Sequence, residues 1–460
     1  MNRKTMHIGF DDTDSTRMGC TTYVAALLVE RLERLGATFI DYPNLIRLNP
    51  NVPWKTRGNG ALCLRIEHDE NAKEEIKETV LNAVEENSDF EWKGTDPGAV
   101  FFPRAKIPTE AKAFARKATI DVVTLKDALM ILRKIGAEAV GYKKGRGIIG
   151  GLAAIGETLE RDHTYEALAY RAPANCGTKR KVDEASIFEM DKATAPRTFN
   201  NVDEEKVRVV ITPRGPDPIL FGIRGETAEV VKKAFRIVRP LESVERWVVF
   251  RTNEGTDAHL SRIASLSQAE PFRSIIARGT VSANPTMIRG RHVIFALKDE
   301  SRRIDCAAYE PTGVLRKVTM RLIGGDVVEV YGAVRPSAGG RPLTVNLEKI
   351  RVIRLAPKLT YQNPVCPKCG KRLKSMGKGQ GFRCEKCGSR NPSLTKTALS
   401  IERDLKKGLY FTSTRSQRHL TKPLRRYGLE KRRPSFEGMV EGWHSPWRQS
   451  GSALNISHSR

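Results

Sequence analysis

Long apolar runs are missing from this chain of 460 residues. None approaches the roughly 20 consecutive apolar residues that a helix needs to cross a bilayer. The opening residues, MNRKTMHIGFDDTDS, lack the apolar core of a secretory signal and turn acidic at once. No tandem repeat is visible, and no basic amphipathic helix has an aromatic face. We therefore expect a cytoplasmic protein that does not bind membranes.

Cysteine is scarce, with eight residues in the whole chain. Four are single, at Cys20, Cys63, Cys176 and Cys306, and the other four form two close pairs near the C-terminus. Scattered cysteines in a long chain without secretory features do not indicate a disulfide framework. The paired set is typical of a metal site instead.

Acidic residues are also in deficit. The chain has 53 Asp and Glu against 79 Lys and Arg, a net charge of +26. Such an excess attracts polyanions, so it favours nucleic acid as a partner, although a merely soluble basic surface has the same composition. Charged residues at 29% and hydrophobic residues at 40% are ordinary for a globular protein. The length predicts three or four domains.

Strand and helix patterns alternate in the first part of the chain. Residues 6–10 predict a short apolar strand, and a helix that ends near Gly36 follows a polar turn. Strands at 38–48 and 61–67 and a helix near 71–86 continue the alternation, which indicates an α/β layer. From residue 206 a strand, loop, strand, helix and strand predict half of a small α+β sandwich.

Residues 273–355 differ from what precedes them. Five short alternating strands are separated by Gly, Pro and Asp turns. This pattern predicts a small closed barrel of the oligonucleotide-binding kind (OB-fold), with another small barrel as the alternative.

Two Cys-x2-Cys pairs form the strongest single motif. Cys366 and Cys369 are separated by 14 residues from Cys384 and Cys387. Each pair brings two thiolates to one ion, and two pairs complete a tetrahedral shell. We expect a structural zinc ion, with an iron–sulfur site as the alternative. The basic residues of this module also favour contact with phosphate.

An acidic cluster follows the first predicted strand directly. Asp11, Asp12 and Asp14 place three carboxylates within four residues, where a cation such as Mg²⁺ would offset their repulsion. The helix that starts near Cys20 also offers free N–H groups to phosphate. An ordinary acidic turn, in which Asp14 or Ser15 caps the helix, is an equally good interpretation of the pattern.

Other candidate residues lie in glycine- and proline-rich turns. Lys143-Lys144-Gly145-Arg146-Gly147 combines cations with small residues, as phosphate sites do, but it lacks the spacing of a P-loop. Arg57 precedes an Asn-Gly turn. Asp217, between two prolines, could present a carboxylate to a cationic substrate or simply form the turn.

Several long motifs occur in an order that resembles the archaeal tRNA 2-agmatinylcytidine synthetases. They are GFDDTDSTRMGCTTYVAALLVERL, LIRLNPNVPWKTRGNGA, GRGIIGGLAAIG, GPDPILFGIRGE and FRTNEGTDAHL, and RHLTKPLRRYG follows at 418–428. The resemblance covers residues from about 6 to 428. Residues 429–460 fall outside it, and the sequence assigns them no function.

The resemblance implies an activity. The family replaces the 2-oxo group of the wobble cytidine with agmatine, in the isoleucine tRNA whose anticodon is CAU. This tRNA then decodes AUA instead of AUG, and ATP is converted to AMP and pyrophosphate. A threonine of the family is phosphorylated, and its position matches Thr21. The implied cofactors are ATP, Mg²⁺ and Zn²⁺, and the implied partners are this tRNA and agmatine.

The resemblance also implies a multidomain fold of α/β and α+β class. We expect an ATP-using kinase-like domain, a ferredoxin-like domain, an OB-fold, a zinc ribbon and a basic tail whose end, from Phe436, is disordered. Their ranges are 1–120, 121–268, 269–357, 358–395 and 396–460.

Roles follow for the candidate residues. The three aspartates would hold Mg²⁺ on the triphosphate, or one would act as a base. ATP would contact Lys143, Lys144, Gly145, Arg146, Gly147 and Arg57. The guanidinium of agmatine needs a carboxylate, for which Asp217 is the candidate. The phosphates of the tRNA would contact His419, Lys422, Arg425 and Arg426.

Two rival interpretations remain open. A non-catalytic RNA- or DNA-binding protein can combine an OB-fold with a zinc ribbon, but it leaves the acidic cluster unexplained. An ATP-dependent RNA enzyme that uses a different amine or base would share most of the features above.

Overall fold

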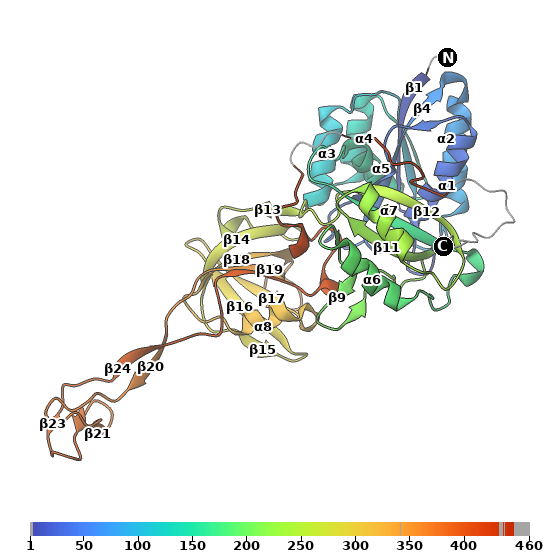
Figure 1. Ribbon diagram of the computed structural model, residues 1–460. Coiled ribbons are helices and arrows are strands. Elements are labelled where there is room, and N and C mark those ends of the chain that lie inside the picture. The colour runs from blue at the N-terminus through green and yellow to red at the C-terminus, as the bar shows by residue number, and fades with distance from the viewer. Residues whose placement is uncertain (1–2, 341, 432–435, 437, 446–460) are drawn as a thin grey trace.

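The computed structural model describes residues 3–340, 342–431, 436 and 438–445. Three parts follow one another along an elongated molecule, as Figure 1 shows. An α/β body is followed by a β-barrel, and a slender arm extends from the barrel to the cysteine module. Within the described ranges, no helix combines the length and the apolar character that a bilayer crossing requires.

The body is built on one ten-stranded sheet. Along the sheet the order is β6-β5-β1-β4-β3-β12-β7-β11-β8, and β2 pairs with β4. The strands are β1 (Arg3–Asp11), β2 (Thr38–Phe39), β3 (Asn44–Arg47), β4 (Gly60–Asp69), β5 (Gly98–Phe102), β6 (Glu138–Gly141), β7 (Thr164–Arg171), β8 (Thr198–Phe199), β11 (Ile219–Gly225) and β12 (Val244–Thr252). The parallel pair of β12 with β3 joins the N-terminal strands to the later ones. The first two expected domains therefore share a sheet.

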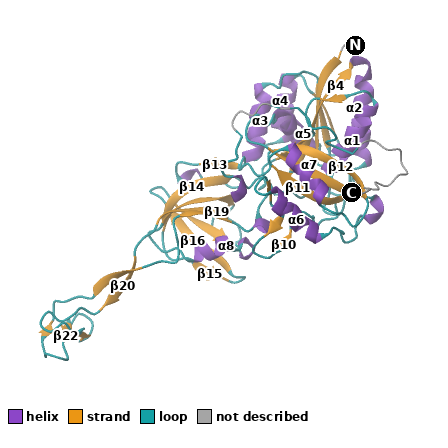
Figure 2. Ribbon diagram, viewed as in Figure 1, coloured by secondary structure: helices purple, strands orange, loops and turns teal. Residues whose placement is uncertain are grey.

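Helices cover both faces of the N-terminal half of the sheet (Figure 2). One face packs against α1 (Thr21–Arg34) and α2 (Lys73–Glu86), and the other against α3 (Thr109–Ile120), α4 (Leu125–Ile135) and α5 (Gly147–Gly156). A strand with helices on both faces is apolar along its length, which explains the buried run Met6–Phe10 in β1. The later strands pack against α6 (Glu184–Thr194) and α7 (Ala228–Ile237).

The helix α5 and the strand β1 touch backbone to backbone. A Cβ atom added to Gly9 would lie 2.0 Å from the carbonyl oxygen of Gly151, and one added to Gly150 would lie 2.0 Å from the carboxylate of Asp11. The glycine-rich stretch therefore forms a helix that packs at close range. This helix, α4 and β6 pack with the N-terminal half of the sheet, although all three lie within the range 121–268 expected for the second domain.

The prediction of a small closed barrel is confirmed. Five strands close on themselves in the order β14-β18-β19-β17-β16, because β16 also pairs with β14. They are β14 (Ser274–Val281), β16 (His292–Lys298), β17 (Arg303–Ala308), β18 (Val327–Arg335) and β19 (Thr344–Arg354). The short strands β13 (Leu260–Arg262), β15 (Thr286–Ile288) and β25 (Gly408–Phe411) extend the sheet, and α8 (Val314–Met320) packs on the barrel.

The arm is a two-stranded ladder of β20 (Lys358–Gln362) and β24 (Thr397–Ile401). At its end, β21 (Lys374–Ser375), β22 (Phe382–Arg383) and β23 (Arg390–Asn391) form a three-stranded sheet. A separate small core, which includes Leu373 and Phe382, surrounds the cysteines. This module connects to the rest of the chain through the ladder, as Figure 1 shows.

The C-terminal segment returns from the arm to the body. There, the carbonyl oxygen of Trp443 accepts a hydrogen bond from the backbone N–H of Val249 at 2.9 Å. The Trp443 side chain is buried in the main core, where its ring contacts Phe39 and Tyr42. This part of the expected disordered end is therefore packed. Residues 446–460 lie outside the described part of the chain.

Candidate active site

A cavity of about 900 Å³ lies between the two halves of the body. The end of β1, the start of α1, the strands β7 and β11 and the C-terminal segment all contribute to its walls. The expected site residues in its lining are Asp11, Asp12, Asp14, Thr21, Arg57, Arg146, Asp217 and His419. Candidates from distant parts of the sequence thus meet at one place.

The acidic cluster stands where β1 ends. The chain turns at Asp12, whose φ of +64° is in the left-handed region. The Oδ2 atom of Asp12 accepts hydrogen bonds from Arg146 Nη2 at 2.9 Å and from the Asp96 backbone N at 3.2 Å. Burial raises the pKa of Asp12 to about 6, although Arg146 opposes this shift. Burial and the charge of Asp12 raise the pKa of Asp11 well above its ordinary value.

Arg57 connects the acidic cluster to the middle of the chain. Its Nε atom donates to Asp14 Oδ2 at 2.7 Å, and its Nη1 atom donates to Asp217 Oδ2 at 3.3 Å. Asp217 also pairs with Arg180 at 3.1 Å. Two guanidinium groups therefore already compensate the carboxylate that was expected to bind agmatine. Arg57 holds the two halves of the cavity together.

The helix α1 begins at the cavity. Cys20 is its N-cap residue, and Thr21 and Thr22 of the first turn line the cavity. The Oγ1 atom of Thr13 donates to Oγ1 of Thr21 at 3.0 Å, so the acidic loop fixes this threonine. Backbone N–H groups of a first turn have no intrahelical partner and carry the positive end of the helix dipole. This end of α1 is suited to an anionic group.

The basic, glycine-rich stretch contributes less than expected. Arg146 lines the cavity, but among the described lining residues Lys143, Lys144, Gly145 and Gly147 are missing. The ammonium of Lys143 donates to the carbonyl oxygens of Phe90 and Trp92 at 3.0 and 2.7 Å. Gly147 lies where α5 packs against β1, since an added Cβ would lie 2.4 Å from the carbonyl oxygen of Asp11.

A buried carboxylate lies behind another wall of the cavity, which its partners Arg47, Arg224 and His419 line, and the motifs did not predict this role. The carboxylate of Glu254, fully buried, lies 2.6 Å from Arg47 Nε, 2.5 Å from Arg224 Nε and 2.9 Å from His419 Nδ1. Burial favours the proton, but Arg224 and Arg47 hold the pKa of Glu254 well below its ordinary value. Its three partners come from three parts of the chain, so Glu254 fixes their relative positions.

Glu166 lies beside this group on β7. Its Oε1 atom accepts from Arg224 Nε at 3.0 Å, and its buried Oε2 atom has no hydrogen-bond partner among the described residues. Burial raises the pKa of Glu166 to about 7, against the effect of Arg224. One sequence signal could have found it, because a carboxylate interrupts the otherwise apolar strand TYEALAYR. The same signal applies to Arg224 in ILFGIRG.

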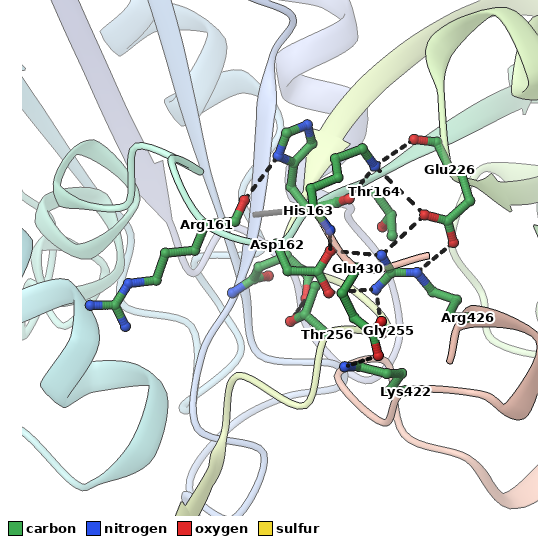
Figure 3. Close-up of polar contacts among 12 residues, drawn as sticks. Arg161, Asp162, His163, Thr164, Glu226, Gly255, Thr256, Lys422, Arg426 and Glu430 are labelled. Atoms are coloured by element: carbon green, nitrogen blue, oxygen red, sulfur yellow. Dashed lines mark hydrogen bonds and ion pairs between the residues drawn. The ribbon is translucent and has the colours of Figure 1, made fainter. Parts of the chain in front are cut away.

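The segment 418–428 connects the body to the barrel. One of its barrel contacts is the hydrogen bond that Thr421 donates to Glu348 of β19. Figure 3 shows Arg426 between Asp162 and Glu226. Its five N–H groups all donate to protein oxygens, those of Asp162, Glu226 and Gly255, and the side chain is fully buried. Arg425 pairs with Asp191 at 2.7 Å and Lys422 with Glu430 at 3.0 Å. Arg426 in particular has no N–H group left for the phosphate contact expected of it.

The four paired cysteines meet in space. All four sulfur atoms lie within 4.8 Å of one another, with Cys366 Sγ 3.5 Å from Cys387 Sγ and Cys369 Sγ 3.4 Å from Cys384 Sγ. Zinc–thiolate bonds of about 2.3 Å place tetrahedral ligands roughly 3.8 Å apart. The donor set and its spacing therefore fit one zinc ion.

Family models match most of the chain. The model described as "TiaS TCKD domain" matches residues 7–144, "TiaS FLD domain" matches 145–259, and "TiaS C-terminal zinc ribbon domain" matches 363–405. Curated relatives named as the isoleucine-tRNA 2-agmatinylcytidine synthetase TiaS are similar throughout. The protein from Methanosarcina mazei is 44% identical over 91% of this chain and 97% of its own. That from Methanocaldococcus jannaschii is 43% identical over 91% and 98%.

Solved structures agree. A complex of TiaS with isoleucine tRNA and ATP matches with a TM-score of 0.83 at 41% identity, over 95% of this chain and 99% of that one. A complex of TiaS with the same tRNA, AMPCPP and agmatine has a TM-score of 0.82 and 39% identity over the same shares. The resemblance that the sequence motifs carried is thereby confirmed, and this chain belongs to the family of the isoleucine-tRNA 2-agmatinylcytidine synthetases (TiaS).

Proposed function

We propose that this protein is an ATP-dependent synthetase that forms 2-agmatinylcytidine at the wobble position of the isoleucine tRNA with the anticodon CAU. The observation that carries the proposal is the cavity, in which the acidic cluster, the start of α1 and the buried carboxylate Glu166 surround one space. A non-catalytic RNA-binding protein has no need for such a chamber. Relatives 44% identical carry the synthetase name, and a related structure contains tRNA, an ATP analogue and agmatine.

The reaction needs an activated oxygen. The 2-oxo group of cytosine is a poor leaving group, so an amine cannot displace it directly. Phosphoryl or adenylyl transfer from ATP to that oxygen makes it leave, and the amine nitrogen then bonds to C2. Such transfer depends on positioning and on neutralisation of charge. The target base must leave its stack to reach the cavity.

Asp11, Asp12 and Asp14 are our candidates for holding Mg²⁺. Carboxylate oxygens suit this ion. Burial raises the pKa values of Asp11 and Asp12, so a bound cation would favour their ionised forms. When bound, Mg²⁺ would neutralise charge on the triphosphate. Arg146 would orient Asp12 and contact the nucleotide phosphates, and we keep Arg57 as the residue that positions Asp14.

The start of α1 would face a transferred or leaving phosphate. Thr21 is held there by Thr13 at 3.0 Å, and it lines the cavity. Both the helix dipole and the threonine hydroxyl favour an anion at that position. Family resemblance makes Thr21 the candidate phosphorylation site.

Glu166 is our candidate for the cationic end of agmatine. It lines the cavity and pairs with one guanidinium, that of Arg224, whereas Asp217 pairs with two, those of Arg57 and Arg180. A guanidinium binds a carboxylate well when both are removed from water. Asp217 would then act as the partner of Arg57 across the cavity.

The domain names follow from the family. We propose that residues 1–120 belong to a kinase-like domain that includes α4 and β6, that the second part of the body is ferredoxin-like, and that the barrel is an OB-fold. The four-cysteine module would be a zinc ribbon on residues 358–395. Its basic surface and the barrel would contact the tRNA body, together with exposed cations of the C-terminal segment.

The test is a reconstituted reaction. Purified protein, a transcript of the CAU-anticodon isoleucine tRNA, ATP and agmatine should give 2-agmatinylcytidine, measured by nucleoside mass spectrometry, with AMP and pyrophosphate released. Parallel reactions contain putrescine, spermidine or lysine in place of agmatine, and a tRNA whose wobble base is uridine. Incorporation of another amine would refute the agmatine assignment, and binding of tRNA without any turnover would favour the non-catalytic alternative.

A further inference from the structure

A second, smaller groove adjoins the catalytic cavity. Its volume is about 600 Å³, and it shares part of its lining with the cavity, including Lys55, Arg57 and His419. The loop 48–58, the end of the barrel strand β18 and the C-terminal segment meet in its walls. The groove therefore adjoins the reaction chamber at the place where the body, the barrel and the C-terminal segment meet.

The groove is strongly basic. Its cationic lining residues are Arg47, Lys55, Arg57, Arg335 and Arg418, and among the described residues no carboxylate lines it. Carboxylates behind the wall compensate Arg47, Arg57 and Arg418, the last through Glu348 at 3.7 Å. Lys55 donates to the carbonyl oxygen of Arg57 at 2.9 Å, and Arg335 is exposed. Within the described chain, neither of these two forms an ion pair.

The cations of the groove act on one another. Burial and the charges of Arg418 and Arg335 lower the pKa of Lys55. An anion between these positive groups would relieve their repulsion. Arg418 is fixed by Asn51, to whose Oδ1 atom it donates at 2.6 Å, so this crowding is part of the folded structure.

An exposed aromatic ring suited to a nucleobase lies next to the groove, on the wall of the main cavity. Trp54 is 48% exposed, precedes Lys55 directly and lines the main cavity. An exposed indole beside uncompensated cations is the combination by which proteins hold single-stranded nucleic acid, with the base on the ring and the phosphate on the cations. The nucleoside triphosphate is the other source of phosphate, but it belongs with the acidic cluster deeper in the cavity.

We propose that Lys55, Arg335 and Arg418 bind a backbone phosphate next to the target nucleotide, and that Trp54 stacks on the neighbouring base. The inference rests on the proposed function only for the identity of the RNA. A phosphate held at the mouth would fix the strand while the target base enters the chamber. The barrel would thereby take part in delivery of the base, through Arg335.

The test uses the double variant Lys55→Ala/Arg335→Ala, which removes the two cations without an ion-pair partner in the described chain. Binding of the full-length CAU-anticodon tRNA, without ATP or agmatine, should weaken by roughly tenfold. The slope of log K against log salt concentration should become shallower, by the amount that about one to two phosphate contacts contribute. The control is Lys233→Ala/Arg236→Ala on the exposed face of α7, which changes the net charge equally. Thermal unfolding of both variants checks that they fold.

Uncharged backbone linkages in the tRNA identify which phosphate the groove binds. Methylphosphonates placed singly on the 5′ and 3′ sides of the target cytidine should weaken binding to the unmodified protein at one of the two positions. The double variant should lose this sensitivity. Equal weakening by the α7 control, or unchanged sensitivity of the double variant, would overturn the proposal. A loss of ATP affinity with tRNA binding intact would overturn it in favour of the nucleotide. Failure of agmatine incorporation alone would refute only the proposed function.

Discussion

The Nη2 atom of Arg146 lies 2.9 Å from Oδ2 of Asp12 and joins the start of α5 to the turn after β1. This contact holds one carboxylate of the acidic cluster in place. Asp12→Asn keeps the shape but removes the charge, so we expect tRNA modification to fall by roughly 100-fold or more, because charge stabilisation in a transfer reaction is lost. Binding of tRNA should stay within about twofold. Glu70→Gln, at an exposed position before α2, is the matched control.

The same carboxylate should make stability depend on pH. The folded pKa of Asp12, about 6, is above its ordinary value of 3.8, so the folded state binds the proton more tightly. The contribution of Asp12 to stability should therefore decrease as pH rises from about 4 to 6. Above pH 6, metal-free Asp12→Asn should be more stable than the parent by roughly 1–3 kcal/mol, and Mg²⁺ should narrow that difference. Denaturant unfolding at pH 4.5 and 7.5 measures it; a parent that gains stability relative to the variant over this range contradicts the assignment.

Removal of zinc should affect the arm and leave the body folded. The cysteine module has its own core and joins the barrel through one β-ladder. A chelator, or Cys384→Ser, should unfold the module because structural zinc sites supply folding energy directly. We expect tRNA affinity to fall while ATP binding and the main unfolding transition are retained. Cys176→Ser, an exposed single cysteine, is the control. A shift of the main transition would show that the module supports the body.

Arg426→Ala should be strongly destabilising. The change leaves Asp162 and Glu226 without the guanidinium that they share, and breaking a buried ion pair costs about 3–5 kcal/mol. Arg425→Ala should cost about 1 kcal/mol or less, because that side chain is partly exposed. Urea titrations of the two variants give the comparison. If Arg426→Ala instead left stability unchanged and weakened only tRNA binding, Arg426 would be a phosphate contact after all.

Trp443→Ala should destabilise the body although it lies far along the chain. Trp443 fills a place in the core between Phe39 and Tyr42, and a large-to-small change there costs about 3 kcal/mol. Calorimetry should show a lower midpoint for the body and an unchanged transition for the zinc module. Phe436→Ala, at a partly exposed ring, should have a smaller effect. A negligible effect of Trp443→Ala would mean that the segment contributes little packing.

Local patterns predicted what depends on local spacing. A few neighbouring residues are enough to specify the Cys-x2-Cys pairs, the alternating barrel strands and the strand before Asp11. All three are present in the fold. The acidic cluster was ambiguous by pattern alone, because a helix cap and a metal site use the same residues. Ordered resemblance across the chain, and then the family models, resolved which family the chain belongs to.

Long-range contacts explain what was missed. The salt bridge between Arg47 and Glu254 spans 207 positions, and nothing near either residue signals the other. Gly147 belongs to a basic stretch that suggested a phosphate site, but it allows α5 to pack closely on β1, which lies far earlier in the chain. Arg426 stands in a basic run and was therefore expected to contact tRNA phosphate. Two carboxylates from elsewhere in the chain determine its burial.

The strand pair β3–β12 has a mechanical consequence. Because Arg251 and Thr252 pair with Asn44 and Leu45, the two halves of the body cannot rotate apart about a hinge without breaking a continuous sheet. Domain closure over the substrate, as in many transferases, is therefore not available across this seam. We therefore expect the RNA to do most of the moving, by bending and unstacking until its base enters the cavity.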